Sequence, residues 1–437
     1  MAMKKKPVTG MKDILPKEMA IRDYAIGLIK ETYRSFGFTS METPAVEHIE
    51  NLTSNQGGEN EKLIFKILKR GEKLDAAVES LTPETAGNLT DSGLRYDLTL
   101  PLSRYYANNE ANLPSPFKAL QMGPVWRADR PQRGRYRQFM QCDIDILGEP
   151  DILAETELVL ATTTLLGRLN FKNFTIRIND RRILKAMAAW SGFKEEDYES
   201  VFITLDKMDK IGLSGVKEEL IGMGYSEETV SRYLGLFPQS EEAEDGVDSA
   251  ANSTDAPEQL KKLQTTLGEY LPEEISNNLA TIIAGVEGAK AADFRMKFDP
   301  TLVRGMSYYT GPIFEISMDE YGGSVGGGGR YDEMIGKFTG QATPAVGFSI
   351  GFERIIMLLL ENGFEVPGAA AKKAYLIEKN MPADKLQKIL AKARTERESG
   401  TIVNISVMKK NKKFQKEKLA EEGYTDITEF FKDREID

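Results

Sequence analysis

The chain has 437 residues, 41% of them hydrophobic and 28% charged, which is long enough for two or three domains and a sizeable core. A formal net charge of −10 excludes general nucleic-acid binding through bulk positive charge, and no apolar run approaches the ~20 residues of a membrane helix. A single cysteine, Cys142, excludes an internal disulfide framework; because no apolar stretch follows the basic N-terminus, we expect a cytoplasmic protein without a membrane partner.

The chain also contains only one histidine, His48, in the sequence "AVEHIENL". Histidine-rich zinc sites, Ser-His-Asp triads and Cys-His nucleophiles are therefore disfavoured. No second type of metal ligand lies beside His48, so we predict a surface or structural role for it. Catalysis is expected from carboxylates, arginines, amides and tyrosines, and no metal site is predicted from protein side chains.

The first part of the chain predicts a helix followed by strands. Apolar side chains recur at helical spacing over residues 21–33, and a Phe-Gly-Phe sequence ends this helix. The sequence "GLRYDLTLPL" predicts a later strand, with Arg95, Asp97 and Thr99 on one face and apolar residues on the other. In this prediction Pro101 ends the strand, and a helix follows.

The sequence "FKALQMGPVWRADRPQRGRYRQFMQCDIDILGE", residues 117–149, predicts two strands joined by a long arginine-rich loop. In the second strand Gln141, Asp143 and Asp145 alternate with apolar residues, so one face is polar and acidic. A solvated face of an antiparallel sheet would have the same pattern. Because the strand predicted at Asp97 also has a polar face, a lined binding site is the favoured interpretation.

The pattern along the chain predicts a sheet-containing core interrupted by helices. Residues 1–181 form the first part of the core, residues 182–295 a helical insertion, and residues 296–361 the second part, in which strands return. After a linker, residues 372–437 alternate β, α, β and α, which is typical of a small α/β module. Residues 240–259 are acidic and poor in large apolar side chains, so we expect a surface connector there.

Three arginines occur where an anion is expected. Arg127 ends a predicted strand, Arg304 precedes a glycine and two tyrosines, and Arg354 lies in the first turn of a predicted helix. Guanidinium groups and helix N-termini both bind phosphate oxygens, although each arginine alone is more often part of a surface salt bridge. The run Gly326–Gly329 predicts either a flexible loop or the wall of a pocket. Walker and Rossmann glycine motifs are absent from the sequence.

Several of these segments together resemble the histidyl-tRNA synthetase family of class II aminoacyl-tRNA synthetases. Residues 117–149 resemble its motif 2, and "LVRGMSYYTGPIFE" resembles its histidine-binding motif. "GGGGRYDEMIGKFTGQATPAVGFSIGFERI" is similar to the second histidine motif and motif 3, and "GMKDILP" to the N-terminus that leads into motif 1. The resemblance implies an α+β fold: an antiparallel sheet flanked by helices, with a helical insertion and a small C-terminal anticodon-binding-like module.

The resemblance also implies roles for individual residues. Arg127 matches the motif 2 arginine at the ATP α-phosphate and substrate carboxylate, Arg304 an arginine that stabilises the α-phosphate, and Arg354 the arginine at the γ-phosphate. Asp129, Arg135 and Phe139 belong to the ATP-binding region. The residues implied in histidine binding are Asp97, Thr99, Gln141, Asp145, Tyr308, Tyr309 and Tyr331. Ser307 stands where the family more often has Asp, so the resemblance assigns it no role.

The implied activity is that of an aminoacyl-tRNA synthetase, which joins histidine to tRNA(His) through a histidyl adenylate and uses ATP with Mg²⁺ as the substrate complex. The implied partners are histidine, ATP, tRNA(His) and a second copy of the chain, which pairs through motif 1 around Pro44. Two alternatives remain. One is a non-catalytic histidine-binding paralogue that acts as the regulatory subunit of ATP phosphoribosyltransferase, and the other is a class II synthetase for another amino acid.

Overall fold

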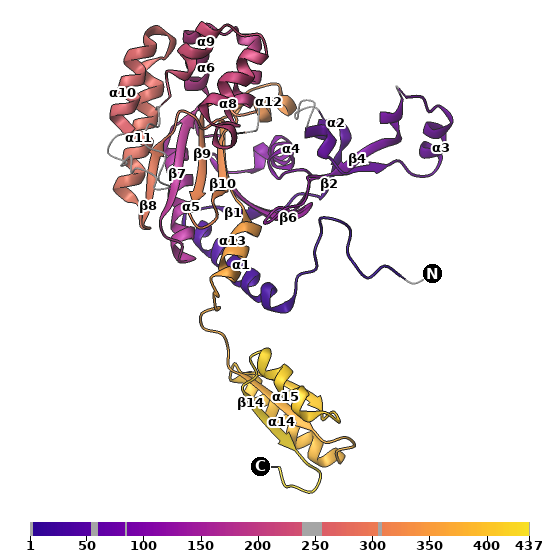
Figure 1. Cartoon of the computed structure of the whole chain (residues 1–437). Helices are drawn as coiled ribbons and strands as arrows, with labels where there is room; N and C mark the ends of the chain where they lie inside the picture. Colours follow the sequence, from indigo (N-terminus) through magenta and orange to yellow (C-terminus); the bar gives the residue numbers. More distant parts are fainter. Residues whose placement is uncertain (1–2, 54–59, 84, 238–255, 305–307, 437) are drawn as a thin grey trace. The chain divides into compact units, whose positions relative to one another are not determined.

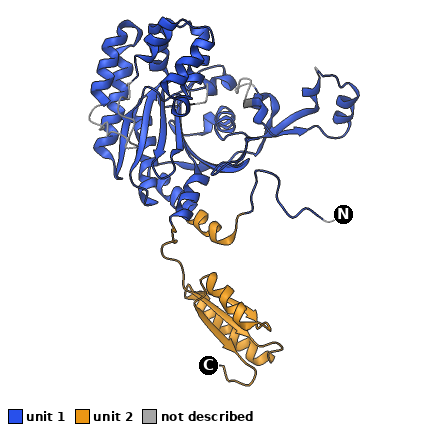
Figure 2. Cartoon of the chain, in the orientation of Figure 1, with its two compact units in different colours: residues 1–13, 25–362 blue, residues 14–24, 363–437 orange. Residues whose placement is uncertain are grey.

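The computed structural model describes residues 3–53, 60–83, 85–237, 256–304 and 308–436. It divides into two compact units (Figure 2). Unit 1 comprises Met1–Asp13 and Ala25–Asn362, and unit 2 comprises Ile14–Tyr24 and Gly363–Asp437. Ser307 and most of the acidic segment 240–259 lie outside the described residues.

An eight-stranded sheet forms the centre of unit 1 (Figure 1). Its strands are β1 (Thr39–Met41), β5 (Phe117–Trp126), β6 (Gln138–Leu147), β7 (Phe174–Asp180), β8 (Phe294–Phe298), β9 (Pro312–Met318), β10 (Gly323–Arg330) and β11 (Ala345–Ile350). They lie in the order β1-β5-β6-β11-β10-β9-β7-β8. Strands β5 to β7 in this order pair antiparallel, and the edge strands β1 and β8 are parallel to their neighbours. The predicted class, an antiparallel sheet flanked by helices, is confirmed.

Most helices of unit 1 either lie near this sheet or follow one another between β7 and β8. Those near the large sheet are α4 (Thr99–Asn109), α5 (Leu153–Arg168), α12 (Glu333–Thr339), α13 (Phe352–Glu361) and the second half of α1 (Pro16–Ser35). Helices α2 (Ile49–Thr53) and α3 (Glu72–Glu79) lie outside this group, with a second, smaller sheet. Those between β7 and β8, where the sequence predicted an insertion, are α6 (Arg181–Ser191), α7 (Tyr198–Leu205), α8 (Met208–Gly222), α9 (Glu227–Leu234), α10 (Ala256–Leu267) and α11 (Glu273–Ala289). Helix α5 packs against β6, β11 and α11 and buries apolar residues such as Leu158 and Leu165 fully.

The predicted strand through Thr99 is wrong. Strand β4 (Thr90–Leu94) ends before Arg95, and α4 begins at Thr99. Pro101 therefore lies in the first turn of a helix, where the N–H that proline lacks needs no helical partner. Arg95 is buried, and its guanidinium compensates for the loss of water by donating to the Pro124 and Thr43 carbonyl oxygens, at 2.8 and 2.7 Å.

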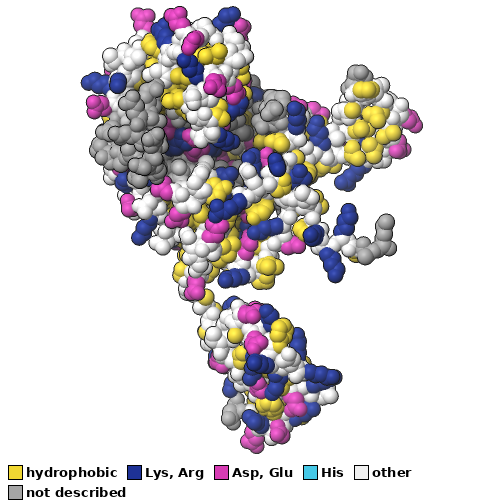
Figure 3. Space-filling view, in the orientation of Figure 1, with side chains coloured by type: hydrophobic (Ala, Val, Ile, Leu, Met, Phe, Trp, Pro, Cys, Tyr) yellow, Lys and Arg dark blue, Asp and Glu magenta, His cyan; other side chains and the backbone are white. Residues whose placement is uncertain are grey.

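Strand β4 is the centre of a separate antiparallel sheet with β2 (Val46–His48) and β3 (Lys66–Leu68). This sheet and α3 extend away from the large sheet (Figure 1). Hydrophobic side chains gather on the surface near α3 (Figure 3), where Leu68, Val78 and Leu81 are each about half exposed.

The glycine run Gly326–Gly329 belongs to strand β10, so the alternative of a flexible loop is wrong. A side chain would not fit at these positions. At Gly328, for example, a Cβ would lie 1.9 Å from the Gly347 carbonyl oxygen on β11. The absence of side chains lets β9, β10 and β11 pair closely.

Arg330, which follows the glycine run, forms a buried ion pair with Glu155 of α5. Its Nε and Nη2 donate to the two carboxylate oxygens at 2.5 and 2.8 Å, and the Glu155 side chain is fully buried.

We expect Arg330→Met to lower the free energy of unfolding by about 3–5 kcal/mol, because it leaves a buried carboxylate without its cation. Urea denaturation of the full chain measures this. The double variant Arg330→Met/Glu155→Gln should recover part of the loss, and a loss as large as that of the single variant would contradict this explanation.

Unit 2 contains a parallel three-stranded sheet in the order β13-β12-β14. Its elements are β12 (Lys372–Ile377), α14 (Ala383–Glu398), β13 (Ile402–Val407), α15 (Lys412–Glu421) and β14 (Asp426–Phe430). The predicted alternation of strands and helices is present, and β14 is an additional strand that the analysis of the sequence missed. None of the helices described in either unit is long and apolar enough to span a membrane.

Candidate active site

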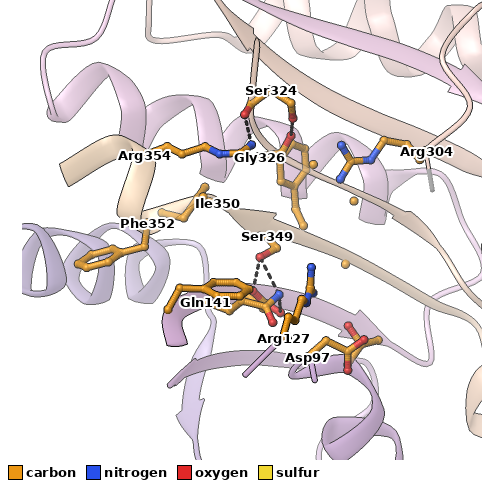
Figure 4. Close-up of a pocket in the computed structure, with 18 of the residues that line it drawn as sticks. Asp97, Arg127, Gln141, Arg304, Ser324, Gly326, Ser349, Ile350, Phe352 and Arg354 are labelled. Carbon is orange, nitrogen blue, oxygen red and sulfur yellow. Dashed lines mark hydrogen bonds between the residues drawn. The ribbon is translucent and has the colours of Figure 1, made fainter. Parts of the chain in front are cut away.

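A cavity of about 550 Å³ lies against the large sheet of unit 1 (Figure 4). Strands β6, β10 and β11, the loop between β5 and β6, the start of α13 and the segments before α4 and β9 all contribute to its wall. All residues for which the resemblance implied a role line this cavity, namely Asp97, Thr99, Arg127, Asp129, Arg135, Phe139, Gln141, Asp145, Arg304, Tyr308, Tyr309, Tyr331 and Arg354. The fold thus brings the predicted site residues together, while their individual roles remain predictions.

Three arginines enter the cavity from different elements (Figure 4). Arg127 follows β5, donates from Nε to the Tyr96 carbonyl oxygen at 3.0 Å, and stacks between two rings, 4.3 Å from Tyr96 and 5.2 Å from Phe139. Arg354, in the first turn of α13, donates to the Ser324 carbonyl oxygen. Because these contacts involve neutral groups, both guanidinium charges remain available to an anion.

Arg304 is held differently, by a carboxylate. Its Nη1 lies 2.7 Å from Oε2 of Glu315 on β9, and its buried Nε has no hydrogen-bond partner. Its guanidinium lies over Gly327, where a Cβ would come within 2.7 Å of Cζ. The backbone of Arg304 has φ = 59°, in the left-handed region that few residues other than glycine adopt. The glycine run therefore makes space for this arginine.

Three aspartates form an acidic part of the cavity. The exposed fractions of Asp97, Asp143 and Asp145 are only 4%, 4% and 3%. Burial raises the pKa of Asp145 to about 7, and burial together with the Asp145 charge raises the pKa of Asp143 well above its ordinary value. Burial also raises the pKa of Asp97, an effect that Arg127 opposes. A bound cation would favour the ionised form of all three carboxyl groups.

Two acceptor atoms in this acidic part lack a partner. Asp97 uses Oδ1 to accept from the Leu100 N–H at 3.2 Å, while its buried Oδ2 has no hydrogen bond. Gln141 donates to Asp143 and Ser349, both at 3.3 Å, and its buried Oε1 is likewise without a donor. Buried acceptors without donors are costly, so this arrangement favours a ligand that carries several N–H groups.

Three tyrosines line the cavity beside Asp145. The Tyr331 hydroxyl donates to Oδ1 of Asp145 at 2.6 Å, and the Tyr308 ring lies edge-on to both Tyr309 and Tyr331, with centroids 4.8 and 6.1 Å apart. Burial raises the pKa of Tyr331 well above its ordinary value, so its hydroxyl stays a donor. A Cβ at Gly347 would lie 2.0 Å from Oδ1 of Asp145, so this position requires glycine.

In the arginine-rich loop, Asp129 and Arg135 bind each other. Nε and Nη2 of Arg135 donate to the two oxygens of Asp129 at 3.1 and 2.9 Å. A bidentate pair of this kind orients the loop at the edge of the cavity. The pair uses Nε and Nη2 of Arg135 and leaves the Nη1 donors for other contacts.

Sequence reasoning assigned no individual role to three carboxylates of this region. It placed Asp143 on the polar face of the strand with Gln141 and Asp145, and Asp143 does line the cavity. Asp206, directly after α7, also lines the cavity, and Glu315 holds Arg304. No local pattern marks these last two, because their neighbours in space are distant in sequence.

The comparisons with known proteins agree on one family. The family model described as histidyl-tRNA synthetase matches residues 10–355. A histidine–tRNA ligase of Leifsonia xyli is 42% identical over 96% of this chain and 93% of its own length, and one of Christiangramia forsetii is 36% identical over 83% and 78%.

Solved structures show the same likeness. A histidyl-tRNA synthetase of Nostoc sp. has a TM-score of 0.75 at 28% identity, over 97% of this chain and 90% of that chain. A Bacillus halodurans protein described as an ATP phosphoribosyltransferase regulatory subunit/histidyl-tRNA synthetase has a TM-score of 0.74 at 18% identity, over 98% and 99%, a likeness of fold alone. The family model and the similarity over nearly the whole chain lead to one conclusion: the chain belongs to the histidyl-tRNA synthetase family of aminoacyl-tRNA synthetases.

Proposed function

We propose that this chain is a histidine–tRNA ligase, which forms histidyl adenylate and pyrophosphate from histidine and ATP and then transfers histidine to tRNA(His). One observation carries the proposal. A single cavity is lined by three arginines and three buried aspartates, which matches a substrate pair that carries both phosphates and cationic nitrogen groups.

The first step is an in-line displacement at the ATP α-phosphorus. A carboxylate oxygen of histidine forms a bond to phosphorus, and the bond to the pyrophosphate oxygen breaks. Charge develops on the phosphate oxygens, so fixed positive groups and positioning lower the barrier, and the protein needs no nucleophile of its own. In this proposal Arg127 and Arg304 contact the α-phosphate and Arg354 the γ-phosphate. Mg²⁺ enters with ATP as the substrate complex.

The acidic part of the cavity would bind histidine. Asp97 and Gln141, each with an unpartnered acceptor, would accept from the α-ammonium group together with Thr99. Asp145 and the tyrosines would surround the imidazole, which offers one donor and one acceptor. Selectivity follows because a side chain without these groups leaves buried polar atoms unpaired.

The remaining parts of the chain complete the proposal. Residues 1–181 and 296–361 form the catalytic core, residues 182–295 the insertion, and residues 372–437 a short anticodon-binding-like module. We further propose a homodimer through the segment around Pro44, with ATP, histidine and tRNA(His) as the ligands.

Exchange of labelled pyrophosphate into ATP tests the proposal. The purified full chain at saturating MgATP should catalyse exchange only when histidine is added, with other amino acids as controls. A regulatory paralogue would bind histidine without exchange, and exchange driven by another amino acid would indicate a different synthetase. Either result would contradict the proposed function.

A further inference from the structure

We infer that Arg177, on strand β7, is a positioning residue that acts on Arg304 through the carboxylate of Glu315. The inference rests on the proposed role of Arg304 in adenylation. Arg177 is not among the residues that line the cavity. Its effect on the reaction would therefore be indirect.

The sheet register places these groups in one row. Asp143, Ser349, Gly327, Glu315 and Arg177 are successive partners across β6, β11, β10, β9 and β7. Residues that are directly opposite in neighbouring strands share a face of the sheet. The gap at Gly327, between the acidic part of the cavity and Glu315, is where the Arg304 guanidinium lies.

Glu315 divides its carboxylate between two arginines. Oε1 accepts from Nη1 of Arg177 at 3.1 Å, and Oε2 lies 2.7 Å from Nη1 of Arg304. All three side chains are largely buried, with exposed fractions of 17% for Arg177, 16% for Glu315 and 23% for Arg304. At such burial the ion pairs are less screened by solvent than surface pairs, and their geometry is better defined.

Arg177 is itself fixed on its other side. Its Nε donates to Oδ2 of Asp299 at 2.7 Å, and its Nη2 donates to Thr301 at 3.3 Å. Its Nη1 also lies 3.4 Å from Asp209 in the first turn of α8, but this carboxylate is 75% exposed, so the contribution of that contact is small. Arg177 is therefore held in place independently of Arg304.

This sharing determines which donors Arg304 has left. Without Arg177, both oxygens of Glu315 could turn to Arg304 and form a bidentate pair, which would neutralise its charge and draw it toward β9. With Arg177 present, one oxygen of Glu315 is occupied, and the buried Nε of Arg304 stays without a protein partner. The geometry thus holds the guanidinium of Arg304 in a fixed direction and leaves it an unpaired N–H donor. A group that binds a phosphate oxygen needs both.

The test compares Arg177→Met with Arg295→Met in the full chain. Arg295 lies on the neighbouring strand β8, in an exposed pair with Asp319 at 3.4 Å, and serves as the matched control. We expect Arg177→Met to lower the kcat of histidine-dependent pyrophosphate exchange about 10–100-fold, with the KM for histidine within about 2-fold of wild type. Arg177→Lys keeps the charge but not the fork of donors, so its kcat should lie between those of wild type and Arg177→Met. Arg295→Met should leave kcat unchanged.

A double-mutant cycle separates positioning from a general loss of structure. In the Arg304→Ala background, adding Arg177→Met should cause no further loss of kcat, because its target is already absent. An unchanged kcat in Arg177→Met, or losses that multiply in the double variant, would overturn the inference. If Arg177→Met does not fold, Arg177→Lys replaces it in the same cycle. Absence of exchange in the wild type would instead contradict the proposed function.

Discussion

Replacement of Arg304 by alanine is expected to lower the rate of histidine-dependent pyrophosphate exchange by about 10²–10³-fold, the effect typical of removing one group that stabilises charge in a transition state. The guanidinium lies in the space above Gly327, inside the cavity, with an unpartnered Nε. In the proposed function it meets charge that develops on the α-phosphate, so its loss should affect the chemical step. The measurements are kcat and the KM for histidine in the exchange assay.

The pattern of the two constants decides the role of Arg304. A group that acts mainly in the transition state lowers kcat and leaves the KM for histidine within a few-fold of wild type. Equal losses in the rate and in histidine affinity would indicate a binding role only. Arg295→Ala, which removes an exposed guanidinium from strand β8, controls for nonspecific effects of losing a charge.

Replacement of Asp145 by asparagine is expected to weaken histidine binding and to stabilise the ligand-free protein. In the proposed function its carboxylate faces the imidazole, and removing one partner of a buried charged hydrogen bond costs about 2–5 kcal/mol, which is roughly 30- to 5,000-fold in KM. The Tyr331 hydroxyl can still donate to the asparagine oxygen, so the local geometry should survive. Exchange kinetics over a range of histidine concentrations measures the loss.

The gain in stability depends on pH in a defined direction. Burial raises the pKa of Asp145 from 3.8 to about 7. Between these values the unfolded chain ionises while the folded chain stays protonated, so the wild type loses stability as the pH rises through this window. Asp145→Asn has no such loss, so its melting temperature without ligands should exceed that of wild type by roughly 2–8 °C near pH 8 and by little near pH 4.

Thermal unfolding of the full ligand-free chain at several pH values measures this difference. Asp91→Asn, which changes an exposed carboxylate on β4, provides the control and should show no such trend. A constant difference between Asp145→Asn and wild type from pH 4 to pH 8 would contradict the raised pKa.

The periodicity of the sequence predicted much of the large sheet. Strands β5 and β6 lie where alternating apolar residues predicted strands, and α13 begins directly after Gly351, as predicted. The prediction succeeds because these elements bury a continuous apolar face. The segment after β4 was misassigned. Its alternating buried residues Tyr96, Leu98 and Leu100 fit a strand, but tertiary packing turns the chain into α4 instead.

The site was only partly accessible to the same reasoning. The polar face of β6 identified Gln141 and Asp145, whereas the joint placement of Arg127, Arg304 and Arg354 came from resemblance to a family. The link from Arg304 through Glu315 to Arg177 depends on the register of three strands, which a single sequence does not specify. Strand β14 was missed because Asp426 and Glu429 make its pattern too polar for a typical strand.

The left-handed backbone of Arg304 affects the stability of the protein. A left-handed conformation costs a residue with a Cβ about 1–2 kcal/mol, and glycine would remove that cost. Glycine would, however, also remove the largely buried ion pair with Glu315, so the backbone strain and the pair can only be lost together. In the proposed function, a variant with glycine at this position would lose exchange activity along with the guanidinium.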